Sequence, residues 1–461
     1  MRVRAVFLAL VSIANTLPAQ TPASGPAQGI AAGMDAYLLR YFKADAPGAA
    51  VLVMKDGQVV LRKGYGLASI ELSAPVKPDT VFHVGSVGKQ FTAAAILKLA
   101  EQGKVDLKAP IGRYLPEAPK AWNSITVENL LTHTSGIENL WSDPAFRPHE
   151  REDLSPEQLL AFVKDKPLQS EPGTRHAYAT VNYTLLAILV GRLSGKPYET
   201  FVADTFFKPL GMKHTTFDED PKLVPGLASA YGPGPTPAPF MSHALGFGGG
   251  SFYSTTEDLA LWTDALQGGK MLSPASLKAM TTAYRLKDGS DTHYGYGLRV
   301  HTLDGEPYLQ SNGDIPGFHS EVVAMPRSHV FVAILHNGED LPIGLDPIGK
   351  RLAAMAAGRP IQEPKAIPLP ERALRALCGR YQSGGAVRTI GLENGRLFSQ
   401  FPGDAPALLS PLSATECFFD ENPDARLGFT LKDGQAIKVQ RYDLDRAPGP
   451  SYTRVDTAPA P

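Results

Sequence analysis

The sequence predicts an α+β protein: an antiparallel sheet flanked by helices and interrupted by a helical insertion, followed by a small all-β barrel or sandwich. Three observations lead to this prediction. A hairpin pattern lies near the N-terminus, residues 86–215 have mainly helical periodicity, and strand patterns return only from residue 296 onward. Strands at both ends of one segment favour a single sheet that both ends assemble. The 461 residues suffice for one large domain and a small one.

The first elements follow from local patterns. Residues 28–43 have the apolar spacing of a helix. Two apolar runs within 49–64 surround Asp56-Gly57, and an Asp-Gly pair between such runs is the strongest short signal for a hairpin. The long helical insertion comes next. We therefore expect a helix and a hairpin before the insertion begins.

The later elements complete the large domain, which we predict to span residues 20–357. A second Asp-Gly pair, Asp304-Gly305, separates two strand patterns. The closing helix should pack on the sheet beside the first one. The predicted elements are strands at 296–301 and 306–310, further strands within 321–337, and a helix at 345–357.

The C-terminal part begins with a proline-rich linker at 358–374 that has no periodicity. Residues 375–461 contain short strand-like runs, with turns at Asn394-Gly395 and Asp433-Gly434, which predict a small antiparallel barrel or sandwich. The stretch from 447 to the end is rich in Pro and Ala, and we expect it to be disordered.

Two cysteines, Cys378 and Cys417, lie in this C-terminal part. Export from the cytoplasm would permit a disulfide between them. Two unpaired buried thiols are the favoured interpretation, because the spacing carries no geometric information.

The N-terminus has the layout of a secretory signal peptide at residues 1–19. Arg2 and Arg4 precede an apolar run at 5–14, and cleavage is expected after Ala19. The alternative is a membrane anchor, but the run is far shorter than the roughly 20 residues that a span needs. We therefore expect a periplasmic or secreted protein without an integral membrane span after cleavage.

Charge excludes several function classes. Acidic and basic residues number 46 and 45, so the chain lacks the basic surplus typical of nucleic-acid binding. The eleven histidines include no H-E-x-x-H motif and no tight Cys/His cluster. We therefore expect no metal, no cofactor and no nucleic-acid partner, and a small molecule or short peptide as substrate. The oligomeric state stays open.

The stretch "HVGSVGKQFTAAAILKLAEQG" at 83–103 points to chemistry. Ser86 and Lys89 are three residues apart, so their side chains can meet across one helical turn. A helix N-terminus favours negative charge at Ser86, and burial favours the neutral form of a lysine. A serine beside a lysine that can lose its proton is an activated nucleophile. The alternative is an N-cap serine with a snorkelling lysine, because S-x-x-K alone is common.

Several longer segments together resemble the serine β-lactamase-like family of class C β-lactamases, DD-peptidases and penicillin-binding proteins. The resemblance spans roughly residues 30–357 in the family's order and implies its fold and its serine hydrolase chemistry. The segments are "FHVGSVGKQFTAAAILKLAEQGKVDLKAPIGRYLPE", "ITVENLLTHTSGI", "EPGTRHAYATVNYTLLAILVGRLSGKPY", "FKPLGMKHTTF", "GGGSFYSTTEDLALW", "YGYGLRV" and "GDIPGFHSEVVAMP".

This resemblance implies the first two catalytic elements. Ser86 and Lys89 form the first. The second is the tyrosine of a Tyr-x-Asn motif, which falls on Tyr178, and its phenolate would take the serine proton and return it to the leaving group. Thr180 occupies the family's asparagine position and has no amide to hold substrate. Asn182 is close in sequence, but the phase of "YATVNY" makes Thr180 the counterpart.

The third element is the family's Lys-Thr-Gly or His-x-Gly triplet, which falls on Ser311-Asn312-Gly313. The backbone N–H groups of Ser86 and Asp314 should form the oxyanion hole. Ser311 brings no positive charge to meet a substrate carboxylate, so we expect esters to be better substrates than free carboxylates. His319 is a second possible source of that charge.

Other conspicuous residues receive plainer interpretations. The resemblance makes the segment of His133 a structural turn rather than part of a Ser-His-Asp triad, and no G-x-S-x-G motif occurs. Gly248-Gly249-Gly250 indicates close backbone approach rather than a phosphate cradle. The proline-rich loop 231–240 is expected at the surface, with a place at the substrate cleft as the alternative. Trp141 and Phe146 belong either to the pocket or to the core.

The sequence thus predicts an exported serine hydrolase that forms an acyl-enzyme at Ser86 and acts on β-lactams, D-Ala-D-Ala-type peptides, or small esters and amides. One alternative is an esterase or D-aminopeptidase on the same scaffold. Another is a penicillin-binding sensor in which Ser86 is acylated and the acyl group is not released. Thr180 and Ser311 keep these alternatives open.

Overall fold

A six-stranded antiparallel sheet organises the large part of the chain in the computed structural model, which describes residues 26–218, 223–443 and 448–455. The predicted signal peptide lies outside the described residues. The strand order is β10-β11-β12-β13-β1-β2, so the N-terminal hairpin pairs with the strand that comes last in sequence. The strands are β1 Ala49–Lys55, β2 Gln58–Tyr65, β10 Arg299–Leu303, β11 Glu306–Ile315, β12 Phe318–Met325 and β13 Val330–His336.

The sheet is assembled from both ends of the segment, as the sequence predicts. Antiparallel pairing places Ala49 of β1 opposite His336 of β13. The hairpin turns form where the Asp-Gly pairs stand: Asp56 and Gly57 have φ of 52° and 73°, and Asp304 and Gly305 have φ of 49° and 75°. Two successive residues with positive φ match the right-handed twist of the flanking strands.

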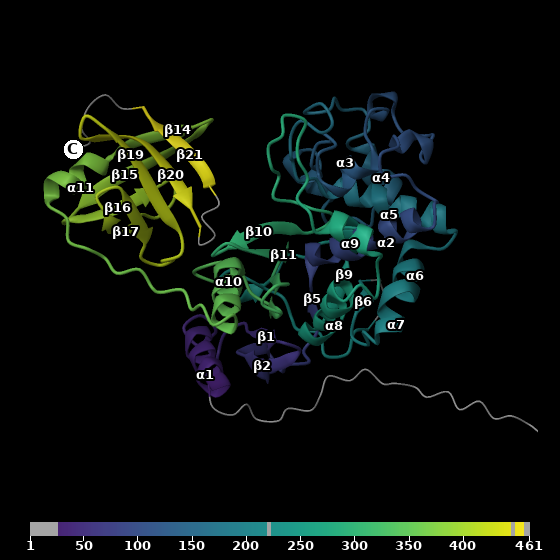
Figure 1. Cartoon of the computed structure of the whole chain (residues 1–461), viewed down its shortest axis with the longest axis horizontal. Coiled ribbons are helices and arrows are strands. Elements are labelled where there is room, and N and C mark those ends of the chain that lie inside the picture. Colours follow the sequence, from purple (N-terminus) through teal and green to yellow (C-terminus); the bar gives the residue numbers. More distant parts are fainter. Residues whose placement is uncertain (1–25, 219–222, 444–447, 456–461) are drawn as a thin grey trace, which may run out of the picture.

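Helices cover both faces of this sheet (Figure 1). One face packs against α1 Pro26–Leu38 and α10 Leu345–Ala356, and the other faces the helical part of the chain. Successive side chains of β1 point to opposite faces of the sheet. Val51 and Val53 join the core under α1 and α10, whereas Ala50 and Leu52 join the core of the helical part. The predicted helix at 28–43 is thus real but ends earlier, at Leu38.

The helical part surrounds one buried helix, α2 Lys89–Glu101, which packs against α5 Thr180–Ser194. Nearly all residues of α2 are buried, so it is a central helix rather than an amphipathic surface helix. Its other helices are α3 Val127–Leu131, α4 Pro156–Ala161, α6 Tyr198–Val202, α7 Lys208–Leu210, α8 Thr256–Gln267 and α9 Pro274–Met280. Short strands join it: β3 Leu67–Ser69, β4 Ala74–Pro75, β5 Phe82–His83, β6 Thr216–Phe217, β7 Tyr231–Gly232, β8 Thr236–Pro237 and β9 Phe252–Ser254.

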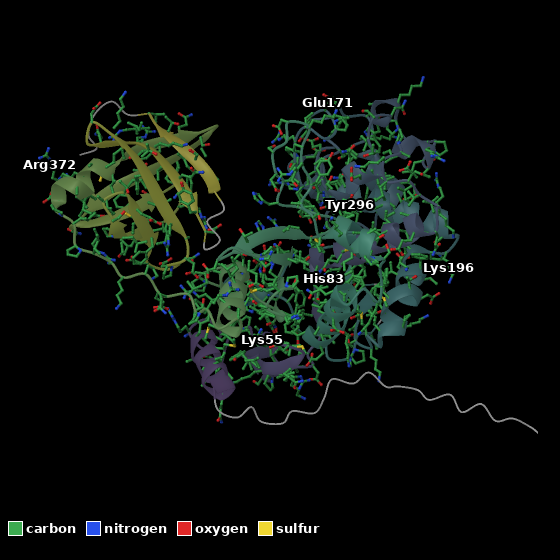
Figure 2. All side chains as sticks on the ribbon, viewed as in Figure 1. Lys55, His83, Glu171, Lys196, Tyr296 and Arg372 are labelled. Carbon is green, nitrogen blue, oxygen red and sulfur yellow. The ribbon has the colours of Figure 1, made fainter. Side chains whose placement is uncertain are left out.

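Polar side chains mark the surface, and a few are drawn into the interior. Figure 2 shows Glu171, Lys196 and Arg372 at the periphery, where all three are exposed. His83 and Tyr296 lie inside the large part and are buried. No helix among the described residues has the length and apolar content needed to cross a membrane.

The C-terminal part is a closed eight-stranded barrel, which confirms the predicted all-β fold (Figure 1). A short helix, α11 Glu371–Leu377, precedes it and begins inside the segment predicted as linker. The strands are β14 Gly379–Ser383, β15 Ala386–Glu393, β16 Arg396–Gln400, β17 Ala407–Ser413, β18 Glu416–Phe419, β19 Arg426–Lys432, β20 Gln435–Tyr442 and β21 Pro448–Arg454.

The last strand corrects one prediction. Within the end predicted to be disordered, Pro448–Arg454 forms β21, which pairs with both β14 and β20 and closes the barrel. Its prolines lie in the first half of the strand, while Ser451, Tyr452 and Thr453 carry most of the pairing and Tyr452 is buried. Residues 456–461 of the same predicted tail lie outside the described residues. Cys378 and Cys417 are buried free thiols in this barrel.

Candidate active site

Ser86 lies in a short 3-10 turn, Gly85–Gly88, that leads directly into α2. The two glycines are required by close packing. A Cβ on Gly88 would come within 2.3 Å of the Phe252 ring, and a Cβ on Gly85, which has φ of 51°, would lie 3.1 Å from the backbone nitrogen of Asp314 in β11. The turn therefore presses Ser86 against the edge of the main sheet. The Ser86 side chain caps no helix, which removes the plain N-cap interpretation.

Lys89 is a buried lysine with 1% exposure. Its Nζ donates to Ser86 Oγ at 2.9 Å and to the carbonyl oxygen of Gly249 at 2.8 Å. Among the described residues no carboxylate lies within ion-pair distance of Nζ. A buried amine is costly unless it is hydrogen-bonded or neutral. Its hydrogen bonds hold Lys89 aimed at Ser86, and Gly249 shows the close backbone approach expected of the triple-glycine stretch.

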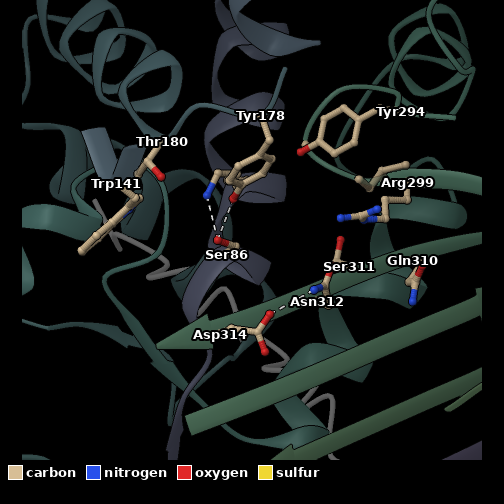
Figure 3. Close-up of a pocket in the computed structure, with 13 residues that line it drawn as sticks. Ser86, Trp141, Tyr178, Thr180, Tyr294, Arg299, Gln310, Ser311, Asn312 and Asp314 are labelled. Carbon is tan, nitrogen blue, oxygen red and sulfur yellow. Dashed lines mark hydrogen bonds between the residues drawn. The ribbon is translucent and has the colours of Figure 1, made fainter. Parts of the chain in front are cut away.

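Tyr178 completes the cluster. Its hydroxyl lies 2.8 Å from Ser86 Oγ, and Lys89 Nζ lies 4.9 Å from the centroid of its ring. Tyr178 comes from a segment far along the chain from Ser86 and Lys89, yet its hydroxyl meets the Ser86 hydroxyl (Figure 3). A serine hydroxyl in contact with both an amine and a phenol can pass its proton to either group when that group is in its deprotonated form.

His133 supports Tyr178 from behind. The two rings lie 4.3 Å apart between centroids, and His133 Nδ1 accepts the backbone N–H of Ala179 at 3.2 Å. Burial, with the nearby charge of Lys89, holds the pKa of His133 well below its usual range, so the ring is neutral. Ser135 donates to Asn182 rather than to His133. The segment is therefore a structural turn, as the sequence predicts, and no Ser-His pair forms.

Thr180 faces the site and Asn182 does not. Thr180 begins α5 beside Tyr178 and lines the cavity at Ser86, whereas Asn182 is fully buried behind it. This arrangement agrees with the assignment of Thr180 to the family's asparagine position. Trp141 also lines the cavity, while Phe146 is fully buried in the core.

Strand β11 brings the third element against Ser86. A Cβ on Gly313 would lie 2.0 Å from the Val84 carbonyl oxygen and 2.8 Å from the Ser86 nitrogen, so only glycine fits there. Ser320 Oγ donates to Val84 O at 2.7 Å and fixes the two backbones together. The N–H groups of Ser86 and Asp314 thus belong to adjoining backbone segments. Their role as oxyanion hole stays a prediction.

Ser311 and Asn312 line the cavity beyond this contact. The Ser311 hydroxyl is buried and has no hydrogen-bond partner among the described residues, so it is available to a ligand. Asn312 Nδ2 donates to Asp314 Oδ2 at 3.2 Å. A polar cavity of about 280 Å³ therefore opens next to the nucleophile.

Arg299 is the site residue that sequence reasoning missed. It stands at the start of β10, opposite Gln310 of β11, and its exposed side chain lines the same cavity (Figure 3). A cationic side chain, absent at position 311, is therefore present in the cavity on the neighbouring strand. Arg299 lies in "YGYGLRV", one of the segments that carry the family resemblance, and that was the available signal.

His319 does not supply that cation. Its Nδ1 lies 2.7 Å from Asp314 Oδ1 and its Nε2 lies 3.1 Å from Glu339 Oε2. Burial disfavours the imidazolium, but these two carboxylates outweigh it and raise the pKa of His319. Both ring nitrogens face carboxylates, and His319 does not line the cavity. Its charge is neutralised within the protein.

No group of His, Cys, Asp and Glu among the described residues is arranged to hold a metal ion. The side chains around Ser86 present a hydroxyl in contact with an amine and a phenol, and the Arg299 guanidinium lines the same cavity.

Comparison with known proteins identifies a matching family and similar relatives. The family described as Beta-lactamase matches residues 27–354. A putative penicillin-binding protein, PbpX, of Bacillus subtilis strain 168 is 32% identical over 286 residues, which are 60% of this chain and 68% of that protein.

Two solved structures are similar in fold. The octameric penicillin-binding protein homologue from Pyrococcus abyssi has a TM-score of 0.65 and 25% identity, and the match covers 90% of this chain and 97% of that one. A D-stereospecific amidohydrolase from Streptomyces sp. has a TM-score of 0.56 and 25% identity, covering 66% and 94%. The match of the family to most of the chain shows that this protein belongs to the Beta-lactamase family.

Proposed function

We propose that this protein is an exported serine hydrolase that forms an acyl-enzyme at Ser86 and transfers the acyl group to water. The observation that carries the proposal is the contact of Ser86 Oγ with Tyr178 at 2.8 Å and Lys89 at 2.9 Å. Export rests on the signal-peptide pattern of residues 1–19.

The proposed reaction has two symmetric halves. Ser86 Oγ attacks the substrate carbonyl carbon while its proton passes to Tyr178 in its phenolate form, and the oxyanion forms at the N–H groups of Ser86 and Asp314. The bond to the leaving group then breaks, and the leaving group takes the proton from Tyr178. Water repeats the sequence on the acyl-enzyme and releases the acid.

Arg299 bears on the substrate. The prediction that esters exceed free carboxylates rests on the missing charge at Ser311 and did not include Arg299, which lines the cavity. We now propose the reverse preference: the leaving group carries a carboxylate that pairs with Arg299. β-Lactams and D-Ala-D-Ala-type peptides have such a carboxylate, and relatives named as penicillin-binding proteins support this class.

The alternative on the same scaffold is an esterase or D-aminopeptidase. Ser311 favours it, because the usual cation is absent at that position, and so does the similarity to a D-stereospecific amidohydrolase. The alternative of another class is a sensor that is acylated once, favoured by Thr180 in place of the amide.

Labelling and turnover test the proposal together. A fluorophosphonate should add one label to the wild type at Ser86, seen by intact mass, and none to Ser86→Ala. A panel of nitrocefin, D-Ala-D-Ala peptides and p-nitrophenyl esters should show many turnovers per enzyme. One equivalent of product and no more would favour the sensor. Wild-type turnover in Ser86→Ala would refute the proposal.

A further inference from the structure

A second cavity, of about 350 Å³, adjoins Ser86. The first cavity contains Arg299, Gln310 and Asn312, whereas most of the wall of the second is apolar. Phe240 is 55% exposed, so its ring can meet a ligand without any rearrangement. The apolar wall of this cavity is formed by Trp141, Phe240, Met241, Leu245, Ile315 and Pro316.

The two cavities meet at the nucleophile. Ser86, Lys89, Trp141, Thr180 and Asp314 line both of them. The strand edge runs through the junction, because Ser311 and Asn312 precede Asp314 on the polar side and Ile315 follows it on the apolar side. A substrate whose carbonyl carbon sits at Ser86 therefore extends one substituent into each cavity.

The position of Tyr178 decides which substituent goes where. Tyr178 lines the polar cavity and is absent from the wall of the apolar one. The leaving group must receive a proton from Tyr178, so it has to depart through the polar cavity. The acyl group, which stays on Ser86, is then held in the apolar cavity.

The two cavities also differ in the charged side chains that line them. The polar cavity offers the Arg299 guanidinium. Glu150, which is half-buried, lines the apolar cavity and not the polar one, whereas Asp314, which is engaged with Asn312 and His319, lines both. An anionic acyl group would face Glu150 without a compensating cation other than Lys89 at the nucleophile.

From this arrangement we propose that the substrate is an acyl amino acid with an apolar acyl group: an amide or ester whose acyl half is uncharged and apolar and whose leaving half carries a free carboxylate. This inference rests on the proposed acyl-enzyme function and narrows it. We therefore expect peptides that have charged side chains in the acyl half to be poor substrates.

A series of p-nitrophenyl esters tests the acyl half with a constant leaving group. From acetate through butyrate to hexanoate, kcat/KM should rise roughly three- to fourfold per methylene until the cavity is full. This factor corresponds to the free energy of burying one CH₂ group. The matched pair of valerate and hydrogen glutarate has equal carbon number and differs by one charge. Glutarate should be at least about tenfold slower.

Variants locate the effect in the apolar cavity. Phe240→Ser and Met241→Ser should lower the ratio of hexanoate to acetate kcat/KM severalfold. The control Leu72→Ser changes an apolar residue that is 79% exposed and lines neither cavity, and it should leave the ratio unchanged. Phe240 is exposed, so its replacement should leave folding intact, which thermal unfolding checks.

The leaving half is tested with N-hexanoylglycine and its amide, N-hexanoylglycinamide. The acid should be hydrolysed faster by tenfold or more. A flat dependence on acyl length, or equal rates for valerate and glutarate, with Ser86 still required for turnover, would overturn this inference alone. Turnover that persists in Ser86→Ala would overturn the proposed function as well.

Discussion

Arg351 of α10 and Asp424 of the barrel form a buried two-point ion pair. Arg351 Nε donates to Asp424 Oδ2 at 2.7 Å, and Nη2 donates to Oδ1. The exposed fractions of the two side chains are 8% and 5%. Arg351 Nη1 also donates to the carbonyl oxygen of Ile361, in the segment that leads to the barrel. The barrel is therefore fastened to the helix that covers the back of the main sheet.

Removal of one partner should be strongly destabilising. We expect Arg351→Met to leave the Asp424 carboxylate buried without a partner and to lower the free energy of unfolding by about 3–5 kcal/mol. Urea unfolding followed by circular dichroism measures this. The control Lys270→Ala breaks the exposed pair with Asp264 and should change stability by less than about 1 kcal/mol.

The ion pair of Arg351 and Asp424 also matters for the prediction that the large domain folds without the barrel. A chain ending near residue 358 keeps both core clusters of the sheet and should fold, judged by near-UV circular dichroism. It also leaves Arg351 without its carboxylate. Replacing Arg351 by Gln in the shortened chain should therefore raise its melting temperature. A shortened chain that is molten with either residue would show that the barrel belongs to the core.

Lys89 and Tyr178 should have separable effects on catalysis. Lys89→Ala is expected to lower kcat by on the order of 10²–10⁴, the usual contribution of acid–base catalysis. Tyr178→Phe keeps the ring and its packing on His133 and removes the hydroxyl that contacts Ser86, so it should lower acylation by a similar factor. Rates of fluorophosphonate labelling measure acylation directly. Lys98→Ala, on the same helix but paired with Glu101, is the control.

Arg299 should set the preference for a carboxylate on the leaving group. Arg299→Gln removes a hydrogen bond to a charged group, worth roughly 1.5–3 kcal/mol, and should lower kcat/KM for acidic substrates about ten- to a hundredfold. Neutral esters should be almost unaffected. The second change Ser311→Lys should restore acidic substrates in the Arg299→Gln background. Equal losses for acidic and neutral substrates would contradict this role.

Acid should destabilise the fold through buried histidines. Burial lowers the pKa of His336 to about 4, although its Nδ1 donates to Gly48 O. Between about pH 6.5 and 4 the unfolded chain binds a proton that the native state refuses, so stability falls as pH falls. At pH 5 the loss from this one group is about 1–2 kcal/mol.

His336→Asn isolates this contribution, because the Asn amide can replace the Nδ1 donor. Urea unfolding at pH 7.5 and pH 5 should show a smaller loss for the variant than for the wild type. His176, whose pKa burial also lowers to about 4, is unchanged in both proteins and cancels in the comparison. An identical pH dependence would refute the assignment to His336.

The features that the sequence could predict are local. The Asp-Gly pairs determine both hairpin turns through two residues with positive φ, and the spacing of Ser86 and Lys89 places them on one turn. Local patterns alone do not predict the place of Arg299 in the site, because it depends on the pairing of β10 with β11 and no local pattern gives that register. β21 was missed for the opposite reason: its proline content suggests disorder, and only its two neighbouring strands make it a strand.

The closure of the barrel has a consequence for handling the protein. β21 lies between β14 and β20, so both of those strands have hydrogen-bonding partners on each side. Deleting residues from 448 onward would strip one side of each strand, and exposed strand edges recruit other chains into aggregates. Affinity tags that are meant to be cleaved should therefore be attached after Val455, where removal leaves the seam of the barrel untouched.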